Sequence, residues 1–343
     1  MLRATLEKIT GGQQITRTEA RRTAKAILAG EVHDCAIAGL LVALKMKGES
    51  AEEIAGFADG MRDMQVSIRP QAEPLVDTCG TGGDGKGTFN ISTVAAIIAS
   101  ACGVAVAKHG NRCVSSSCGS ADVIEYLGVD INMEPERVKS CIERVGIGFL
   151  FAPTFHPAMK RVMEARKALG VPTIFNILGP LTNPAGAGAR VLGVSREELL
   201  PLIGEVLCEL EIERAFVLHG RDGMDEFSLV AETMVCEVQN GKASSYVISP
   251  EDIGLRRCEP GELLGGEARR NASIFKEVLS GREGPRLDIS VANAAFALQA
   301  GGIADSLAEG VRMARHAVES GEAMRRLEML VGFSKDGGDG SVP

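Results

Sequence analysis

The feature of this chain that most restricts its fold is the loop of residues 80–87, where glycine occupies positions 80, 82, 83, 85 and 87. An apolar strand at residues 75–76 leads into the loop, and a helix that begins at residues 90–93 and ends at Gly103 follows it. Glycine-rich connections from strand to helix expose backbone N–H groups, and the helix N-terminus adds a partial positive charge. This order of elements predicts an α/β domain with a phosphate-binding loop.

A second strand–loop–helix unit follows directly. Its apolar strand, residues 104–107, leads into a polar and cationic run made of Lys108, His109, Gly110, Asn111 and Arg112. A serine- and glycine-rich loop at residues 115–120 then precedes a helix that ends at Gly128. Concave nests of backbone N–H groups bind phosphate. Two such loops, with Lys108 and Arg112 between them, therefore suit a ligand that carries more than one phosphate group.

Two common nucleotide-binding motifs match the first loop only in part. Gly80, Gly82 and Gly85 have the spacing of the dinucleotide fingerprint, but the helix opens only at Asn90 and no acidic residue stands about 20 positions further on. A P-loop begins in the same way, but Gly87 stands where that motif needs Ser or Thr. Both interpretations are disfavoured, and a loop that served only as a tight turn would not account for the cationic run.

These segments also resemble those of a known family, the anthranilate phosphoribosyltransferases. The matching segments, in the family's order, are GTGGD at 80–84, NIST at 90–93, KHGNR at 108–112, SSxxGSAD at 115–122, FAPxxHPAMK at 151–160, FNILGPLxNPA at 175–185 and HGxxGxDE at 219–226. They span most of the 343 residues, so the combined signal is highly specific.

The resemblance implies an enzyme that transfers the phosphoribosyl group of phosphoribosyl pyrophosphate to the amine of anthranilate. The products are N-(5-phosphoribosyl)anthranilate and pyrophosphate, in the second step from chorismate to tryptophan. It also implies Mg²⁺, with two ions per subunit, and a homodimer formed through the N-terminal helical domain. No general base is evident, although His109 is a candidate catalytic residue.

The resemblance assigns site residues as well. Donor binding falls to Gly80, Gly82, Gly83, Asp84, Thr88, Asn90, Ile91, Ser92, Thr93, Lys108, His109, Gly110, Asn111, Arg112, Cys113, Val114, Ser115, Ser116 and Ser120. Anthranilate binding falls to Gly80, His109, Asn111 and Arg166, and metal binding to Ser92, Asp225 and Glu226.

Asp225 and Glu226 also point to a metal without the family. They follow an apolar strand, residues 215–219, and ligands bind beyond the carboxyl ends of strands in open α/β sheets. Carboxylates are the hard oxygen ligands that Mg²⁺ prefers, although most such pairs are surface charge. Arg166 is more ambiguous, because it lies on the flank of the apolar stripe of a predicted helix, 157–169, where arginine is usually solvated. Its partner there would be the anthranilate carboxylate.

The domain organisation follows from periodicity. Residues 1–68 predict a helical domain of four helices, with capping boxes at Thr16/Glu19 and Ser50/Glu53, and helices from about 155–180 are expected to join it. A proline-containing linker leads to an α/β domain with a mostly parallel sheet, residues 75–335, and residues 336–343 predict a flexible tail.

Composition narrows the remaining classes. The net charge is −8 and no basic block is present, which argues against nucleic-acid and anionic-membrane partners. No signal pattern or membrane-length apolar run is evident, so a cytoplasmic location is expected. Two alternatives stay open: a pyrimidine-nucleoside phosphorylase of similar plan, and a nucleic-acid-binding homologue without activity. The first is usually longer, and the second should be basic and should lack the Asp225–Glu226 pair.

Overall fold

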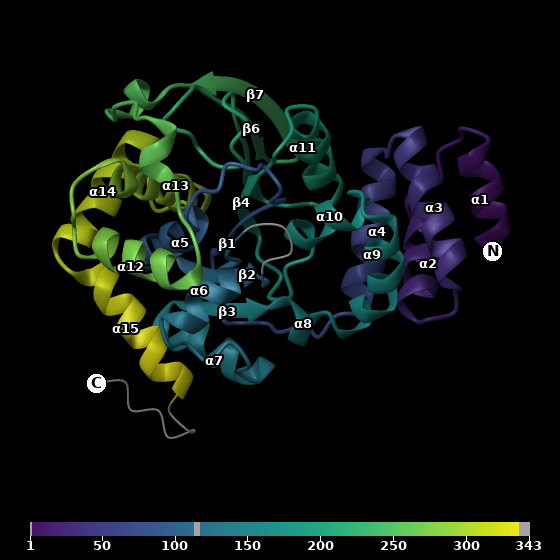
Figure 1. Cartoon of the computed structure of the whole chain (residues 1–343), viewed down its shortest axis with the longest axis horizontal. Coiled ribbons are helices and arrows are strands. Elements are labelled where there is room, and N and C mark those ends of the chain that lie inside the picture. Colours follow the sequence, from purple (N-terminus) through teal and green to yellow (C-terminus); the bar gives the residue numbers. More distant parts are fainter. Residues whose placement is uncertain (1, 113–116, 336–343) are drawn as a thin grey trace.

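A helical bundle and a larger α/β domain make up the chain, as Figure 1 shows. The computed structural model describes residues 2–112 and 117–335. The bundle consists of α1 (Leu2–Thr10), α2 (Arg17–Leu28), α3 (Asp34–Lys47) and α4 (Ala51–Asp63). The predicted fold class is therefore confirmed, whereas the tail at 336–343 lies outside the described residues.

Both predicted capping boxes begin helices of the bundle. The Thr16 hydroxyl accepts from the Glu19 N–H at 3.3 Å, and the Glu19 carboxylate accepts from the Thr16 N–H at 3.0 Å. Ser50 and Glu53 exchange the same two bonds at 3.3 and 2.9 Å. Each pair satisfies two N–H groups that the first helical turn would otherwise leave without partners.

The α/β domain is built on one seven-stranded sheet. The strands, in spatial order, are β3 (Ile147–Phe151), β2 (Ala105–Gly110), β1 (Leu75–Gly80), β4 (Ala189–Gly193), β5 (Arg214–Gly220), β6 (Thr233–Gln239) and β7 (Lys242–Ile248). The strands from β3 to β5 are parallel to their neighbours, and β6 and β7 join antiparallel at one edge. The mostly parallel sheet is the one expected.

Two strands are longer than the sequence predicted. β1 was expected at 75–76 and β2 at 104–107, but pairing continues to Gly80 and Gly110. Polar residues such as Asp77 and Lys108 extend these strands because β4 and β3 supply backbone partners on their open sides. The predicted cationic run therefore starts inside a strand, and Lys108 is buried.

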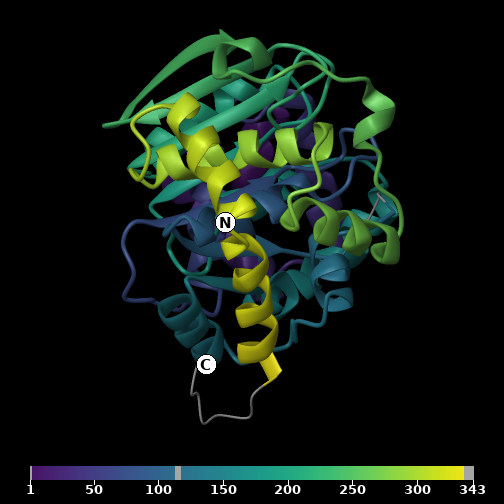
Figure 2. The same cartoon turned by 90° about the vertical axis from the view of Figure 1, so that its left-hand side faces the viewer.

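Both faces of the sheet are buried, and its side chains alternate between two cores. On β5, Phe216 and Leu218 join one hydrophobic cluster, whereas Ala215 and Val217 join the other. The first cluster is covered by α5 (Ile91–Ala101), α6 (Ser120–Tyr126), α7 (Pro135–Val145), α12 (Ala268–Leu279), α13 (Pro285–Ala300), α14 (Leu307–Glu319) and α15 (Glu322–Lys335). Figure 2 shows α12–α15 in front of the sheet on this side. Burial on both faces is typical of parallel sheets.

The second core joins the sheet to the helical bundle. It contains residues of α11 (Leu199–Glu209) and of the segment between β3 and β4. That segment holds α8 (Ala152–Phe155), the 3₁₀ turn η1 (Pro157–Val162), α9 (Met163–Leu169), α10 (Phe175–Leu178) and the 3₁₀ turn η2 (Gly179–Leu181). Phe175 packs edge-on against Phe57 of α4, with ring centroids 6.3 Å apart. The assignment of residues 155–180 to the helical domain stays a prediction.

The predicted helix at 157–169 is not continuous. It begins as a 3₁₀ turn with Pro157 in its first position and becomes α-helical only at Met163. The remaining short elements are the 3₁₀ turns η3 (Pro250–Ile253) and η4 (Pro260–Leu263). None of the helices at 2–112 and 117–335 has the length and apolar character needed to cross a membrane.

Glu53 ties three parts of the helical bundle together. Its side chain has 0% exposure, and its carboxylate accepts from Lys47 Nζ at 2.7 Å, from the Ser50 N–H at 2.9 Å and from the Ile15 N–H at 3.0 Å. We expect Glu53→Ala to lower the free energy of unfolding by about 3–5 kcal/mol, because it leaves a buried ammonium and two N–H groups without their partner. Urea unfolding followed by circular dichroism measures this change.

Glu7→Ala is the matched control, since the Arg3–Glu7 pair is exposed, with 92% and 65% of the side chains accessible. It should change the free energy of unfolding by less than about 0.5 kcal/mol. Equal effects of the two variants would show that Glu53 has no special role.

Candidate active site

Four neighbouring strands of the sheet end in glycine at their carboxyl ends. β1, β2, β4 and β5 end at Gly80, Gly110, Gly193 and Gly220. A Cβ atom at Gly193 would lie 1.6 Å from the Asp225 carbonyl oxygen, and one at Gly80 would lie 2.7 Å from the Asp225 carboxylate. The absence of side chains at these two positions lets the loop after β5 lie directly on the ends of β1 and β4.

The glycine-rich loop is fastened at both ends and exposed in the middle. The Thr81 N–H donates to the Gly193 carbonyl at 2.9 Å, and Gly265 donates to the Gly87 carbonyl at 2.9 Å. Between these anchors Gly82 and Gly83 adopt φ values of 65° and 80°, which side-chain-bearing residues rarely tolerate. Thr88, just beyond the loop, forms an isolated bridge with Leu264. The anchored loop presents an exposed backbone, as a phosphate cradle requires.

Three carboxylates face one another beside this loop. Asp225 accepts from the Gly82 N–H at 2.9 Å, and Glu226 accepts from the Ser92 N–H at 3.1 Å. Burial raises the pKa of Asp225 to about 7, with a further rise from the Asp84 carboxylate. Burial and then the Asp225 carboxylate raise the pKa of Glu226 to about 8. The two side chains are half-buried and are not free surface charges.

Asp84 leaves one carboxylate oxygen of this cluster without a hydrogen-bond partner in the described chain. One of its oxygens accepts from the Lys86 N–H at 3.1 Å, and the other is buried without a hydrogen-bond partner in the described chain. Within residues 2–112 and 117–335, no group of three or more His, Cys, Asp or Glu is already spaced to hold a metal. A cation bound here would therefore need further oxygen ligands, which water and a phosphate supply for Mg²⁺.

Helix α5 points its N-terminus at the cluster. Ser92 lies in its first turn and Asn90 is its N-cap residue, whose side chain donates to the Cys118 carbonyl at 3.1 Å and accepts from Asn271 at 3.0 Å. Ile91 and Thr93 are both buried; Ile91 belongs to the core, and the Thr93 hydroxyl has no hydrogen-bond partner among the described residues. The helix N-terminus favours negative charge and helps to hold the carboxylates or an anionic ligand.

The two cations of residues 108–112 do not both lie between the two loops, as the sequence predicted. Lys108 is buried and its Nζ donates to the Thr78 carbonyl, while its charge lowers the pKa of the nearby Glu226. Arg112 is exposed and pairs with Glu125 at 2.7 Å and Asp122 at 3.1 Å. In the second loop, Asn111 accepts through its carbonyl from the Ser120 hydroxyl at 3.4 Å.

The remaining loop positions fall into two groups. Gly110 ends β2, where a Cβ atom would lie 2.3 Å from the Ser120 hydroxyl oxygen. The predicted site residues Cys113, Val114, Ser115 and Ser116 lie outside the described residues.

His109 is buried on the sheet face that meets the helical domain. Its backbone N–H donates to the Asp77 carboxylate at 3.2 Å, and its ring lies 5.1 Å from that of His156. Burial lowers the pKa of His109 to about 4 and that of His156 to about 3. Both imidazoles are therefore neutral near pH 7. Asp77 is a residue that the sequence reasoning missed, and its only signal was a carboxylate inside an apolar strand.

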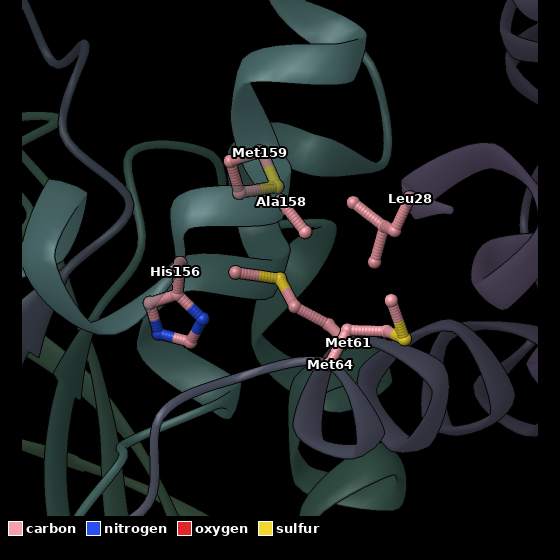
Figure 3. Close-up of a pocket in the computed structure, with 6 residues that line it drawn as sticks. All are labelled: Leu28, Met61, Met64, His156, Ala158 and Met159. Carbon is pink, nitrogen blue, oxygen red and sulfur yellow. The ribbon is translucent and has the colours of Figure 1, made fainter. Parts of the chain in front are cut away.

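His156 also lines a crevice between the two domains. Figure 3 shows its ring beside side chains of the helical domain and η1, and the lining residues are Leu28, Met61, Met64, His156, Ala158 and Met159. The crevice is too narrow for a water molecule. It is a packed contact between the domains and not a preformed ligand cavity.

Arg166 lies on α9, on the helical side of the interdomain space (Figure 1). Burial lowers its pKa, and no carboxylate among the described residues offsets the lost hydration. The structure thus brings Gly80 and His109 to neighbouring strand ends and places Arg166 on the other domain. A half-buried guanidinium without a carboxylate partner is suited to an anionic ligand.

Comparisons with known proteins give consistent results. Residues 3–64 match the glycosyl transferase family, helical bundle domain, and residues 72–324 match the glycosyl transferase family, a/b domain. The chain is 48% identical over 333 residues to the anthranilate phosphoribosyltransferase of Desulfatibacillum aliphaticivorans, covering 97% of this chain and 98% of that protein. It is 49% identical over 326 residues to that of Haloferax volcanii, covering 95% and 98%.

Solved structures agree in shape along the whole chain. Anthranilate phosphoribosyltransferase from Thermus thermophilus superposes with a TM-score of 0.92 at 47% identity, covering 96% of this chain and 99% of that one. The enzyme from Saccharomyces cerevisiae, in complex with PRPP (phosphoribosyl pyrophosphate) and Mg, gives a TM-score of 0.89 at 29% identity, covering 97% of each chain.

Gly193 provides a test of how the carboxylates are held. We expect Gly193→Ala to weaken binding of phosphoribosyl pyrophosphate with Mg²⁺ at least tenfold, about 1.4 kcal/mol, because the added methyl group displaces the Asp225 backbone. Calorimetric titration measures the affinity, and the melting temperature reports on the fold. In the control Gly188→Ala, the new Cβ atom would lie 3.4 Å from Glu213, an ordinary contact. Wild-type donor affinity in Gly193→Ala would contradict the expectation.

Proposed function

The chain belongs to the anthranilate phosphoribosyltransferase family of glycosyltransferases, and from this premise we propose how its two domains divide the reaction. The enzyme transfers the phosphoribosyl group of phosphoribosyl pyrophosphate to anthranilate, giving N-(5-phosphoribosyl)anthranilate and pyrophosphate, in the second step from chorismate to tryptophan. The phosphorylase and non-enzymatic alternatives are set aside, because transferases of 48–49% identity match along nearly the whole chain.

The reaction requires charge stabilisation and positioning rather than a covalent intermediate. When the bond between ribose C1 and the pyrophosphate oxygen breaks, positive charge develops on the ribose and negative charge on the leaving group. A protein can accelerate such a step by holding the leaving group and placing the amine near C1. The observation that carries our assignment is the cluster of Asp84, Asp225 and Glu226 beside the glycine-rich loop.

The carboxylate cluster fits a divalent cation. Burial, followed by the charge of a neighbouring carboxylate, raises the pKa of Asp225 and of Glu226, and one Asp84 oxygen is buried without a partner in the described chain. We assign Mg²⁺ to Asp225, Glu226 and the Ser92 hydroxyl, and we place Asp84 with the donor next to them. When bound, Mg²⁺ neutralises part of the pyrophosphate charge. Two ions per subunit would match the spread of the carboxylates over two loops, but their number remains our proposal.

The donor belongs to the α/β domain in this proposal. The exposed backbone around Gly83, the N-terminus of α5 and the charge of Lys108 all favour phosphate oxygens. Arg112 is exposed and held by Glu125, so its guanidinium would have to exchange this partner for a phosphate. Thr88, Asn90, Thr93 and Ser120 remain predicted donor ligands.

The acceptor belongs between the domains. Arg166 would bind the anthranilate carboxylate, and Gly80, His109 and Asn111 would frame the ring. His109 carries no charge near pH 7, since its pKa is lowered to about 4, so it does not compete for the carboxylate. Anthranilate's aromatic amine has a free lone pair at this pH, and no side chain is needed to deprotonate it.

We also propose a homodimer formed through the helical domain. Met46 on α3 is 83% exposed, and α1 and α3 form the end of the molecule furthest from the sheet (Figure 1). In the proposed dimer, the second copy covers this end of the helical domain, including Met46. A monomer mass in sedimentation equilibrium would exclude this. The cytoplasmic location stays a prediction.

The metal assignment gives a test that separates function from folding. Asp225→Asn with Glu226→Gln should reduce kcat at least about 100-fold, because the cation loses both carboxylates. The melting temperature without Mg²⁺ should stay equal or rise, because the amides relieve the repulsion and still accept from Gly82 and Ser92. The decrease in anthranilate fluorescence on adding phosphoribosyl pyrophosphate and Mg²⁺ measures turnover.

Asp222→Asn is the control for this double variant, because Asp222 lies in the same loop and its carboxylate accepts from the Met224 N–H at 3.4 Å. It should keep wild-type turnover. Near-normal activity of the double variant at limiting Mg²⁺ would show that Asp225 and Glu226 do not hold the metal.

Arg166 tests the acceptor half. Arg166→Ala should raise KM for anthranilate about tenfold or more, because a charge-assisted bond is worth about 1.5–3 kcal/mol, and should leave KM for the donor nearly unchanged. Steady-state kinetics with each substrate varied in turn measures the split. Lys167→Ala, a neighbouring cation whose side chain is 67% exposed, is the control. If Arg166→Ala changed KM equally for the two substrates, Arg166 would have no specific role in binding anthranilate.

A further inference from the structure

Residues 179–183, which lead into β4, form hydrogen bonds with side and main chains of several elements. Arg190 of β4 donates through Nη1 to the Pro180 carbonyl at 2.6 Å, and Arg62 of α4 donates through Nη2 to the Leu181 carbonyl at 2.8 Å. Asn183 donates through Nδ2 to the Ala107 carbonyl of β2 at 2.9 Å. The two arginines thus hold consecutive carbonyls at the end of a helical turn, where no intrahelical partner is available.

This arrangement is costly, which indicates that it serves more than packing. Arg190 is only 1% exposed, and burial lowers its pKa and outweighs the opposing effect of Asp77. Its Nε and one oxygen of Asp77 are buried without hydrogen-bond partners in the described chain. Apolar residues of similar size often stabilise such a position as well or better.

The fastened segment lies against the strand ends that carry the proposed acceptor residues. The Pro180 carbonyl is 3.9 Å from Cys79 Sγ, and Cys79 directly precedes Gly80. The Gly179 backbone faces the His109 ring and partly offsets the fall in its pKa. Asn183 contacts Ala107, two residues before His109. A shift of the segment would therefore move the surroundings of both Gly80 and His109.

We propose that Arg190, together with Arg62, is a positioning residue for anthranilate: it holds segment 179–183 in the place that shapes the acceptor site between the domains. The inference rests on the proposed acceptor site. Arg190 touches neither substrate and acts through the Pro180 carbonyl. The donor site, on the far side of Gly80 around Asp225, does not depend on this segment.

The test compares Arg190→Met and Arg62→Met by steady-state kinetics. Arg190→Met should raise KM for anthranilate about tenfold and leave KM for phosphoribosyl pyrophosphate within about twofold. Arg62→Met should show the same split, and Arg190→Lys should restore part of the loss, because an ammonium can still donate to Pro180. If both arginines act through one segment, the double variant should raise KM for anthranilate by less than the product of the single effects.

Arg214→Met is the matched control, because Arg214 is a half-buried arginine on β5 that pairs with Glu237 at 3.5 Å, away from this segment. It should lower the melting temperature without changing either KM. An Arg190→Met enzyme that behaves as Arg214→Met does would overturn the proposal, and so would multiplicative effects in the double variant. If Arg190→Met does not fold, Arg62→Met decides the outcome alone. A wild-type protein that fails to consume anthranilate would instead refute the proposed function.

Discussion

Mutual repulsion among the carboxylates of Asp84, Asp225 and Glu226 is the constraint on which the rest of the site depends. Asp225 and Glu226 lie close together in partly desolvated positions, and burial, followed by the charge of the neighbouring carboxylates, raises the pKa of both groups. Backbone N–H groups of Gly82 and Ser92 hold two of them in place. In the proposed function, a cation bound beside these carboxylates would offset their repulsion and would favour a polyphosphate ligand next to it.

Glycines at the carboxyl ends of two strands leave the space that Asp225 occupies. Gly193 leaves room for the Asp225 backbone, and Gly80 leaves room for its carboxylate. The core beneath, buried on both faces of the sheet, keeps the strand ends fixed while the loops above them carry the chemistry. A rigid sheet and polar loops at its strand ends together allow an enzyme to hold a substrate in a fixed position.

The acceptor half follows a different principle, since it depends on two domains meeting. One continuous core runs from the helical bundle through Phe175 to the sheet, so the domains are packed and not merely tethered. Beside that core, the half-buried Arg62 and the buried Arg190 donate hydrogen bonds to the connecting backbone. Electrostatic interactions at this boundary are strong because little water remains to screen them.

The sequence by itself determined the fold class and the family, and it located the loops that we propose for the donor site. Glycine spacing, capping boxes such as Ser50/Glu53 and the Asp225–Glu226 pair are patterns of residues close together in the chain. Such patterns can be recognised from the sequence alone. Only the tertiary structure showed that Lys108 is inside a strand, that Arg112 is paired, and that Asp77, Asp84 and Arg190 face residues far away in the chain. Burial and the distance between charges set these properties. Both depend on which strands become neighbours in the sheet, and patterns of residues close together in the sequence do not determine that order.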